Sequence, residues 1–259
     1  MRIWQTKLRV REQAVPSALE HEFLARLGSR EEIAENTIAC RFDKPPSFAF
    51  QPGQFVDITL LNPRETDAEG NSRAFSIAST PQDNFLLIAT RLRGSAFKRV
   101  LSQMPPGTEV KLDGPFGDLR LHRDRSREAV ILCGGIGITP FRSIILDATQ
   151  KQLRRRILLF YSNRRPEDAA FLEEMTALAK QDPNFTLIAC MTNMKSSHRH
   201  WAGEQEPISR KILEKHLARL PSPVYYLTGP PGFVAGMRVI LAEYGVDDDN
   251  LRVEEFTGY

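Results

Sequence analysis

Hydrophobic and polar residues alternate along the first half of the chain, as in half-buried strands. In Thr37–Phe42 the alternation places Ile38, Cys40 and Phe42 on one face. Turn residues such as Pro105-Pro106-Gly107 separate several short segments of this kind. The first half is therefore predicted to be an antiparallel β-barrel or sandwich, with strands at Thr37–Phe42, Gln51–Leu60, Phe75–Ser79, Phe85–Arg93 and Glu109–Leu112 and a helix at Ala96–Gln103.

The pattern changes after about Arg125, where apolar strands alternate with amphipathic helices. Ala129–Cys133 is continuously apolar, and Phe171, Met175 and Leu178 recur at helical spacing. This order predicts a parallel sheet covered by helices on both faces. The predicted strands are Ala129–Cys133, Ile157–Tyr161, Phe185–Cys190, Val224–Thr228 and Leu251–Phe256, and the predicted helices are Phe141–Thr149, Pro166–Lys180, Ser209–Arg219 and Gly232–Tyr244.

The charged stretch His122–Glu128 separates the two patterns. We therefore expect a two-domain protein, with an antiparallel β-barrel domain at residues 1–125 and an α/β parallel-sheet domain at residues 126–259. A length of 259 residues is enough for two hydrophobic cores. Residues 1–18 fit neither pattern and are predicted to be an extra arm.

Charge and hydropathy narrow the class of protein. The net charge of +3 is small, and a nucleic-acid-binding protein would show a concentrated basic stripe with interleaved aromatic residues. No apolar run approaches the length that spans a bilayer, and Met1–Val10 carries charges where a signal peptide is apolar. We expect a cytoplasmic protein with no nucleic-acid or membrane partner.

The cysteines and histidines bear on metal binding. Cys40, Cys133 and Cys190 lie far apart, whereas iron–sulfur clusters and structural zinc sites need clustered ligands. Only His198 and His200 lie close together among the five histidines, and such a pair is typical of a solvated loop. The sequence therefore predicts no metal site.

A glycine-rich turn, Cys133-Gly134-Gly135-Ile136-Gly137-Ile138-Thr139-Pro140, joins a predicted strand to a predicted helix. Glycines at such a turn let the backbone approach a pyrophosphate, and the helix N-terminus offers free N–H donors. Pro140 suits the first helical turn, where its missing N–H has no cost. The alternative is a tight turn without a ligand, because the stretch does not follow the G-x-G-x-x-G pattern.

A second motif, Arg73-Ala74-Phe75-Ser76, opens a predicted strand. An arginine can bind a phosphate, an aromatic ring can lie on a ring system, and a hydroxyl can bond a ring nitrogen. The alternative is a surface charge, a core aromatic and an ordinary strand hydroxyl.

The order of these motifs resembles the ferredoxin–NADP reductase superfamily, with Gly114-Pro115-Phe116-Gly117 between them. The resemblance runs from about residue 20 to the C-terminus. It implies a flavin-binding antiparallel β-barrel domain followed by a nicotinamide-nucleotide-binding α/β domain. It also implies that Arg73 binds the flavin phosphate, that Phe75 packs against the isoalloxazine, and that Ser76 lies near its reactive nitrogen. Tyrosine is more usual than phenylalanine at position 75.

The resemblance also suggests which flavin is bound. Arg91, Gly94 and Ser95 match the stretch that wraps the pyrophosphate in family members that use FAD. The family's Ser or Thr falls near Phe97 in this chain. FAD is therefore expected, with FMN as the less favoured alternative.

Further positions are implied on the nicotinamide side. The loop facing the nucleotide is matched by Gly134, Gly135, Gly137, Thr139 and Pro140. Thr228-Gly229-Pro230 resembles the family's C-G-P turn, whose cysteine approaches the nicotinamide. At the C-terminus, Glu254 is a candidate proton relay, and Phe256 or Tyr259 is a candidate to cover the second flavin face.

The choice of nucleotide rests on the loops after the second and third strands of the parallel sheet. Ser162, Arg164 and Arg165 follow the second strand and can contact a 2′-phosphate. Thr192-Asn193 follows the third strand, where NADP-specific relatives often have Ser-Arg. The sequence favours NADP and leaves NAD open.

The resemblance implies electron transfer between NAD(P)H and a separate one-electron carrier, such as a ferredoxin, a flavodoxin or an oxygenase component. Such carriers are typically acidic, and Arg91, Arg93, Lys98 and Arg99 are candidates for a complementary patch or for an ordinary basic surface. Alternative acceptors are a free flavin, a ferric chelate or a haem protein. Another alternative is a nucleotide-binding electron-transfer subunit of a larger complex.

Overall fold

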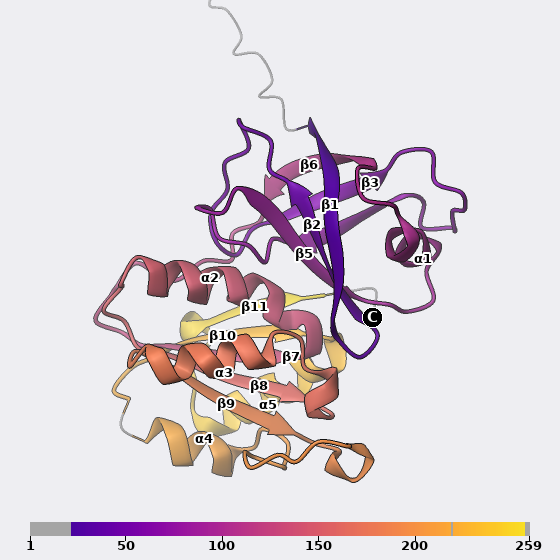
Figure 1. The fold of residues 1–259 in the computed structure, drawn as a ribbon. Helices are drawn as coiled ribbons and strands as arrows, with labels where there is room; N and C mark the ends of the chain where they lie inside the picture. Colours follow the sequence, from indigo (N-terminus) through magenta and orange to yellow (C-terminus); the bar gives the residue numbers. More distant parts are fainter. Residues whose placement is uncertain (1–21, 219, 257–259) are drawn as a thin grey trace, which may run out of the picture.

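The computed structural model describes residues 22–218 and 220–256, so the predicted arm at residues 1–18 and Tyr259 lie outside the described residues. These residues form an antiparallel β-domain and an α/β-domain, the upper and lower parts of Figure 1. In the first domain the strand order is β4-β3-β6-β1-β2-β5. Its elements are β1 (Glu22–Ala34), β2 (Thr37–Asp43), β3 (Phe55–Leu60), β4 (Ser72–Ser76), β5 (Phe85–Arg91), α1 (Ala96–Gln103) and β6 (Glu109–Phe116).

The antiparallel sheet closes into a barrel where the chain after one edge strand, β4, meets the other edge strand, β5. Just after β4, the Ala78 N–H donates to Leu87 O of β5 at 2.7 Å. Along β3, Val56, Ile58 and Leu60 are buried and alternate with half-buried residues, as the sequence pattern requires. The first domain is thus the predicted antiparallel barrel.

One strand of this barrel was not predicted from the sequence. The 13-residue strand β1 lies in the middle of the sheet, between β6 and β2. Its register with β2 shifts between Leu27 and Ser29 and again between Glu32 and Ala34. Irregularities of this kind interrupt the two-residue alternation, because an extra residue moves the side chains that follow to the other face.

The second domain has the predicted parallel sheet, in the order β11-β10-β7-β8-β9. Helices α2 and α3 bury their apolar side chains on one face of the sheet, and α4 and α5 bury theirs on the other. Its elements are β7 (Ala129–Gly134), α2 (Ile138–Gln150), β8 (Ile157–Asn163), α3 (Leu172–Gln181), β9 (Phe185–Met191), α4 (Arg210–Leu217), β10 (Val224–Gly229), α5 (Pro231–Tyr244) and β11 (Leu251–Glu255). The predicted division between residues 125 and 126 falls between β6 and β7.

The helix predicted at Pro166–Lys180 is divided in the structure. A short 3₁₀ turn covers Pro166–Asp168, and α3 begins only at Leu172. Phe171, between them, has a φ of 58°, a left-handed conformation that no α-helix accommodates. The division leaves the turn free to contact the first domain.

Helix α2 fastens the two domains together. Arg142 Nη1 donates to Ala78 O at 2.5 Å, and Ser143 Oγ donates to Ser79 O at 2.6 Å. Arg142 also forms a two-bond ion pair with Glu174 of α3, at 2.6 Å for each bond. The segment that leaves β4 is therefore held against the helix that follows the glycine-rich turn.

Gly53 lies where the loop before β3 meets the second domain, and we predict that Gly53→Ala destabilises the fold. Its φ is +97°, and a Cβ atom there would lie 2.1 Å from Leu119 O and 3.0 Å from Ile144 Cδ1. Left-handed backbone costs about 1–2 kcal/mol, and overpacking costs a further 1–3 kcal/mol or so. Gly107, with a φ of +86° and nothing within 4 Å, is the matched control.

Thermal unfolding followed by circular dichroism checks this prediction. Gly107→Ala is expected to lower the midpoint by roughly 2–4 °C, the shift that about 1 kcal/mol produces in a chain of this size. Gly53→Ala is expected to lower it by at least about twice as much. Equal shifts in the two variants would contradict the predicted clash.

Candidate active site

The carboxyl ends of the parallel strands bring several predicted residues into one row. Thr228 of β10 lies beside Glu254 of β11 on one side and beside Cys133 of β7 on the other. Gly134 of β7 pairs with Ser162 of β8. Ligands of α/β sheets bind outside this edge, so residues predicted from three separate motifs lie at one candidate site.

The glycine-rich turn packs directly against the Thr228-Gly229 segment. A Cβ atom on Gly137 would lie 3.0 Å from Thr228 Oγ1 and 3.1 Å from Gly229 Cα, tighter than most contacts of real Cβ atoms. Thr228 is fully buried, and its hydroxyl donates to Gly137 O at 2.8 Å. Thr228 therefore holds the glycine-rich turn in place.

Helix α2 begins immediately after this turn. Thr139 Oγ1 donates to Ile136 O at 2.9 Å, which fixes the first turn of the helix. Pro140 lies in that same first turn, where the backbone N–H has no intrahelical acceptor. The turn and the helix N-terminus, from Gly134 and Gly135 to Pro140, thus have the arrangement that binds an anion in such sheets.

Glu254 and Phe256 lie at the end of β11, next to this turn. The Glu254 carboxyl group is partly buried, and its Oε2 has no hydrogen-bond partner among the described residues. Burial raises the pKa of this carboxyl group above its ordinary value, because the charged form loses hydration. The Phe256 N–H donates to Gly229 O at 3.2 Å. Gly229 is followed by Pro230, the N-cap residue of α5. A carboxyl group whose pKa is raised by burial therefore lies in the same row as Thr228.

On the barrel domain, Arg73 and the N-terminus of α1 converge on one carboxylate. Asp67 Oδ1 accepts from Arg73 Nη2 at 2.9 Å, and Asp67 Oδ2 accepts from the Ala96 N–H at 2.8 Å. Arg73 Nη1 also donates to backbone carbonyls, among them that of Ser72 at 2.7 Å. The Ala96 N–H is the largest cause that lowers the pKa of Asp67, followed by burial, which opposes it, and by the Arg73 guanidinium. We call Arg73 and the Ala96 N–H the anion cradle.

The side chains beside the cradle belong to the barrel core. Phe75 is 8% exposed, and its ring centroid lies 5.6 Å from that of Phe97. Ser76 is 7% exposed. Ser95 caps α1 by accepting from the Lys98 N–H at 3.2 Å, and Gly94 precedes this cap. Phe75 therefore packs on Phe97, the position where the family has a hydroxyl residue.

A cavity of about 370 Å³ opens between the two domains. Its walls come from the β1–β2 hairpin, from the end of β5 and from the loops after β8 and β9. Arg91, predicted to wrap a flavin pyrophosphate, is one of these residues, and its Nη2 donates to Asp168 O at 2.8 Å. The lining residues are Glu35, Asn36, Arg91, Leu92, Arg93, Arg164, Arg165, Asp168, Asn193 and Ser196.

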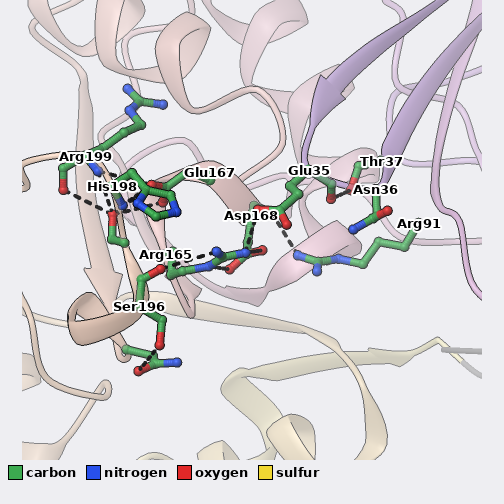
Figure 2. A network of polar contacts seen from close by, with 12 residues as sticks. Glu35, Asn36, Thr37, Arg91, Arg165, Glu167, Asp168, Ser196, His198 and Arg199 are labelled. Carbon is green, nitrogen blue, oxygen red and sulfur yellow. Dashed lines mark hydrogen bonds and ion pairs between the residues drawn. The ribbon is translucent and has the colours of Figure 1, made fainter.

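Arg165 is held by two carboxylates at this cavity. Its Nε and Nη2 donate to Asp168 at 3.0 and 2.8 Å, and Nη2 also donates to Glu35 Oε2 at 2.7 Å. Figure 2 shows that Glu35 reaches this arginine from the barrel domain. The hydrogen bond to Asp168 is the largest cause that raises the pKa of Arg165. The structure therefore engages Arg165 in an ion-pair network, whereas Arg164 is exposed beside it.

The four basic residues considered for a carrier surface differ in their surroundings. Arg99 forms a two-bond ion pair with Glu65, and Arg91 lies in the domain interface. Lys98 is partly buried, and burial is the main cause that lowers its pKa, with Arg93 nearby as a further cause. The complementary patch for an acidic carrier stays a prediction.

Four carboxylates at these sites were not predicted from the sequence. Asp67, Glu69, Glu35 and Asp168 each engage a cation or an N–H that the motifs suggested for ligand binding. Asp67 does so from a loop six residues before Arg73, and Glu35 does so from another domain. The short motifs contain no signal for such pairing, because it depends on the tertiary fold.

The described residues contain no group of three or more His, Cys, Asp or Glu side chains that could hold a metal ion. Cys40, Cys133 and Cys190 are buried free thiols. In the part of the chain that the structure describes, no helix is long and apolar enough to cross a membrane.

The sequence matches the family model of the oxidoreductase NAD-binding domain at residues 131–238. It is 29% identical over 202 residues to a Na(+)-translocating NADH-quinone reductase subunit of Methylococcus capsulatus, a match covering 72% of this chain and 49% of that protein. The chain spans about half the length of the curated relatives it matches. Their name argues against the expectation that a membrane partner is absent.

Solved structures share the fold over nearly the whole chain. A ferredoxin NADP+ reductase from Neisseria gonorrhoeae with bound FAD and NADP has a TM-score of 0.73 at 18% identity, covering 91% of this chain and 98% of that chain. The FAD/NAD-binding domain of the Vibrio cholerae nitric oxide dioxygenase has a TM-score of 0.74 at 19% identity, with coverages of 90% and 98%.

These matches agree with the two sheets and the nucleotide-type turn described above. Residues 131–238 therefore match the oxidoreductase NAD-binding domain, and the described residues share the two-domain fold of a ferredoxin NADP+ reductase and of an FAD/NAD-binding domain.

Proposed function

We propose that this chain is an NAD(P)H-dependent flavoprotein reductase that passes electrons from a nicotinamide nucleotide to a separate one-electron carrier. One observation carries the proposal: the strand that bears Arg73 of the anion cradle is fastened to the helix that begins at the glycine-rich turn. Arg142 and Ser143 make this connection through Ala78 O and Ser79 O. Two candidate anion-binding elements from different domains are thereby connected, and we infer that they border one crevice.

The residues of the cradle fit a flavin phosphate. The Asp67 carboxylate is a stand-in anion, since a guanidinium and a helix N–H both bind it within 2.9 Å. A phosphate oxygen accepts hydrogen bonds from the same donors. A bound flavin accepts a hydride from a nicotinamide nucleotide and releases electrons singly. The stretch with Arg91, Gly94 and Ser95 resembles the one that wraps the pyrophosphate in family members that use FAD, and it supports FAD over FMN.

Other residues position the reactants and control protons. The Thr228 hydroxyl, by binding Gly137 O, keeps the backbone amides of the glycine-rich turn oriented toward a dinucleotide pyrophosphate. Burial raises the pKa of Glu254 at the row of strand ends and so favours its protonated form, which suits a proton donor for electron transfer. Ser76 and Thr228 are both buried, which helps keep water out of the crevice.

A second candidate function is suggested by the sequence relatives. Each is named as one subunit of a Na(+)-translocating NADH-quinone reductase, and this chain matches about half of their length. The chain would then be the NADH-oxidising part of a quinone reductase, with its electrons passing to a quinone through other subunits. This function uses the same crevice and differs in the acceptor.

The central test is the colour of the purified full chain. We expect a bound flavin, with its visible absorbance, that is bleached under anaerobic conditions by NADH or NADPH. Protein that lacks flavin absorbance after purification in the presence of FAD would refute the proposal.

The bleached protein is then mixed with one of three oxidised acceptors: a ferredoxin, a flavodoxin or a water-soluble quinone. Faster reoxidation by the protein carriers supports the first function, and faster reoxidation by the quinone supports the second.

Arg73→Ala is expected to weaken FMN and FAD binding by roughly tenfold to a hundredfold, because a hydrogen bond to a charged group contributes about 1.5–3 kcal/mol. Binding is measured by quenching of flavin fluorescence. Riboflavin, which has no phosphate, is expected to bind the variant and the parent protein equally. Arg64→Ala is the matched control, since Arg64 is exposed on the same loop and has no ion pair with the described residues. Full FMN affinity in Arg73→Ala would show that Arg73 does not bind the flavin phosphate.

The pH dependence of turnover tests Glu254. Because burial raises its pKa, the protonated carboxyl group is present below this raised pKa and is lost as the pH increases through it. We expect NAD(P)H oxidation to slow over that interval in the parent protein. In Glu254→Gln the rate should be lower and independent of pH there. Glu255→Gln, at the next and exposed position of β11, should keep the parent profile. Identical profiles for all three proteins would exclude Glu254 as the donor.

A further inference from the structure

We propose that the β1–β2 hairpin and the 3₁₀ turn Pro166–Asp168 hold the two domains in the position that hydride transfer requires, with Glu35 and Arg165 as positioning residues. We call Glu35, Arg91, Arg165 and this turn the clasp. The inference rests on the proposed function and deepens it, since it concerns how the nucleotide side of the site is held against the flavin side. It also assigns Arg165 to the contact between the domains and not to the nucleotide.

The tip of the β1–β2 hairpin contacts the α/β domain through apolar side chains and through its backbone. At the end of β1, Ile33 and Ala34 pack against the buried core of the α/β domain. At the tip that follows, the Glu35 N–H donates to Glu167 O of the 3₁₀ turn at 2.8 Å. A hairpin of the barrel is therefore attached to the second domain by its main chain, independently of any charge.

The side chain of Glu35 adds an ion pair to this contact. Glu35 Oε2 accepts from Arg165 Nη2 at 2.7 Å, as Figure 2 shows. Arg165 Nε and Nη2 also donate to the Asp168 carboxylate at 3.0 and 2.8 Å, and Arg165 Nη1 donates to Ser196 O at 3.4 Å. All three guanidinium nitrogens of Arg165 therefore have partners within the protein, and a nucleotide phosphate has to displace a carboxylate to bind Nε or Nη2.

Arg91, at the end of β5, connects the clasp to the glycine-rich turn. Its Nη2 donates to Asp168 O at 2.8 Å. A Cβ atom on Gly135 would lie 3.5 Å from the same nitrogen, so the guanidinium group lies against the glycine-rich turn. Ile136, the next residue of that turn, packs against a buried cluster of barrel residues that includes Ala89 of β5. The clasp therefore adjoins the turn at which we expect the nucleotide pyrophosphate.

The 3₁₀ turn is held by its own domain as well. The Glu167 carboxylate accepts hydrogen bonds from the backbone N–H groups of His198 and Arg199 and from the Ser197 hydroxyl, in the loop after β9 (Figure 2). Burial opposes the ionised form, but these bonds and the Glu167 N–H lower the pKa of Glu167 to about 2. The carboxylate is therefore ionised at neutral pH, and the turn is attached to the α/β domain on one side and to the barrel on the other.

Hydride transfer depends on such control, because the two reacting rings are held by different domains in the proposed function. A displacement of about 1 Å can slow a reaction about a hundredfold. Arg142 and Ser143 fasten the domains at α2, and the clasp fastens them at a second place. Two separate attachments oppose rotation about either one. Without the Glu35–Arg165 ion pair, we expect the domains to shift about the attachment at α2 while flavin and nucleotide still bind.

The test is stopped-flow bleaching of the flavin-loaded full chain under anaerobic conditions, with NADH and with NADPH. The dependence on nucleotide concentration separates the limiting rate from the dissociation constant. In Glu35→Gln and in Arg165→Gln the limiting rate should fall at least about tenfold with both nucleotides, while the dissociation constants and the bound flavin stay unchanged. The double variant should be no slower than Arg165→Gln, because both substitutions remove the same ion pair.

Glu31→Gln is the matched control for these variants. Glu31 is exposed on the same hairpin and has no ion pair or side-chain hydrogen bond with the described residues. It should therefore keep the limiting rate of the parent protein with both nucleotides.

Two kinetic outcomes would overturn the inference. Parent limiting rates in Glu35→Gln and Arg165→Gln would show that the ion pair does not position the reactants. Weaker binding of NADPH alone in Arg165→Gln, with NADH unaffected, would show that Arg165 binds the nucleotide phosphate. Neither result affects the proposed function, because the parent protein would still be bleached.

Failure of both nucleotides to bleach a bound flavin in the parent protein would instead refute the proposed function. Amide hydrogen exchange then tests the clasp without any turnover. The Glu35 N–H, bonded to Glu167 O, should exchange at least about tenfold faster in Arg165→Gln than in the parent protein, because the hairpin tip opens more often. Equal exchange in the two proteins would overturn the clasp.

Discussion

The site depends on two backbone carbonyls that follow β4, Ala78 O and Ser79 O, and on the side chains of α2 that bind them. Arg142 and Ser143 donate to these carbonyls at 2.5 and 2.6 Å. The Ser143 hydroxyl and both carbonyls lie in a buried contact, where an unpaired polar group costs about 1–3 kcal/mol. These bonds oppose movement of the segment after β4 relative to α2, and so they help to set the position of the anion cradle relative to the glycine-rich turn.

Internal carboxylates then determine which cations remain for ligands. Asp67 is bound at the anion cradle, and Glu35 and Asp168 bind Arg165. In the proposed function a flavin phosphate would displace Asp67 and Glu69 from Arg73; Asp67 is partly exposed and Glu69 is exposed, whereas Asp168 is 8% exposed and paired with Arg165. The two arrangements thus differ. Asp67 occupies a place that an incoming anion can take, whereas Asp168 and Arg165 form a fixed part of the cavity lining.

The sequence predicted what depends on local pattern. The helix Ala96–Gln103 and the five strands of the parallel sheet were found because burial on one or both faces imposes a regular period. Strand β1 was missed because its register shifts disturb that period, and the helix at Pro166–Lys180 was predicted as continuous because nothing local marks Phe171 as left-handed. The same limit applies to the site. The motifs located Arg73 and the glycine-rich turn, but the partners Asp67 and Glu35 depend on the tertiary fold.

Thr228 shows how a departure from a family pattern can be understood physically. The family's cysteine at this place approaches the nicotinamide, whereas this chain has a hydroxyl that donates to Gly137 O and is fully buried. A thiol is a weaker donor than a hydroxyl, so a cysteine here would hold the turn less firmly. The threonine therefore favours a rigid glycine-rich turn over a side chain directed at the ligand. Thr228 lies between two titratable groups, Cys133 of β7 and Glu254 of β11, and burial raises the pKa of both, which favours the neutral form of each at this edge.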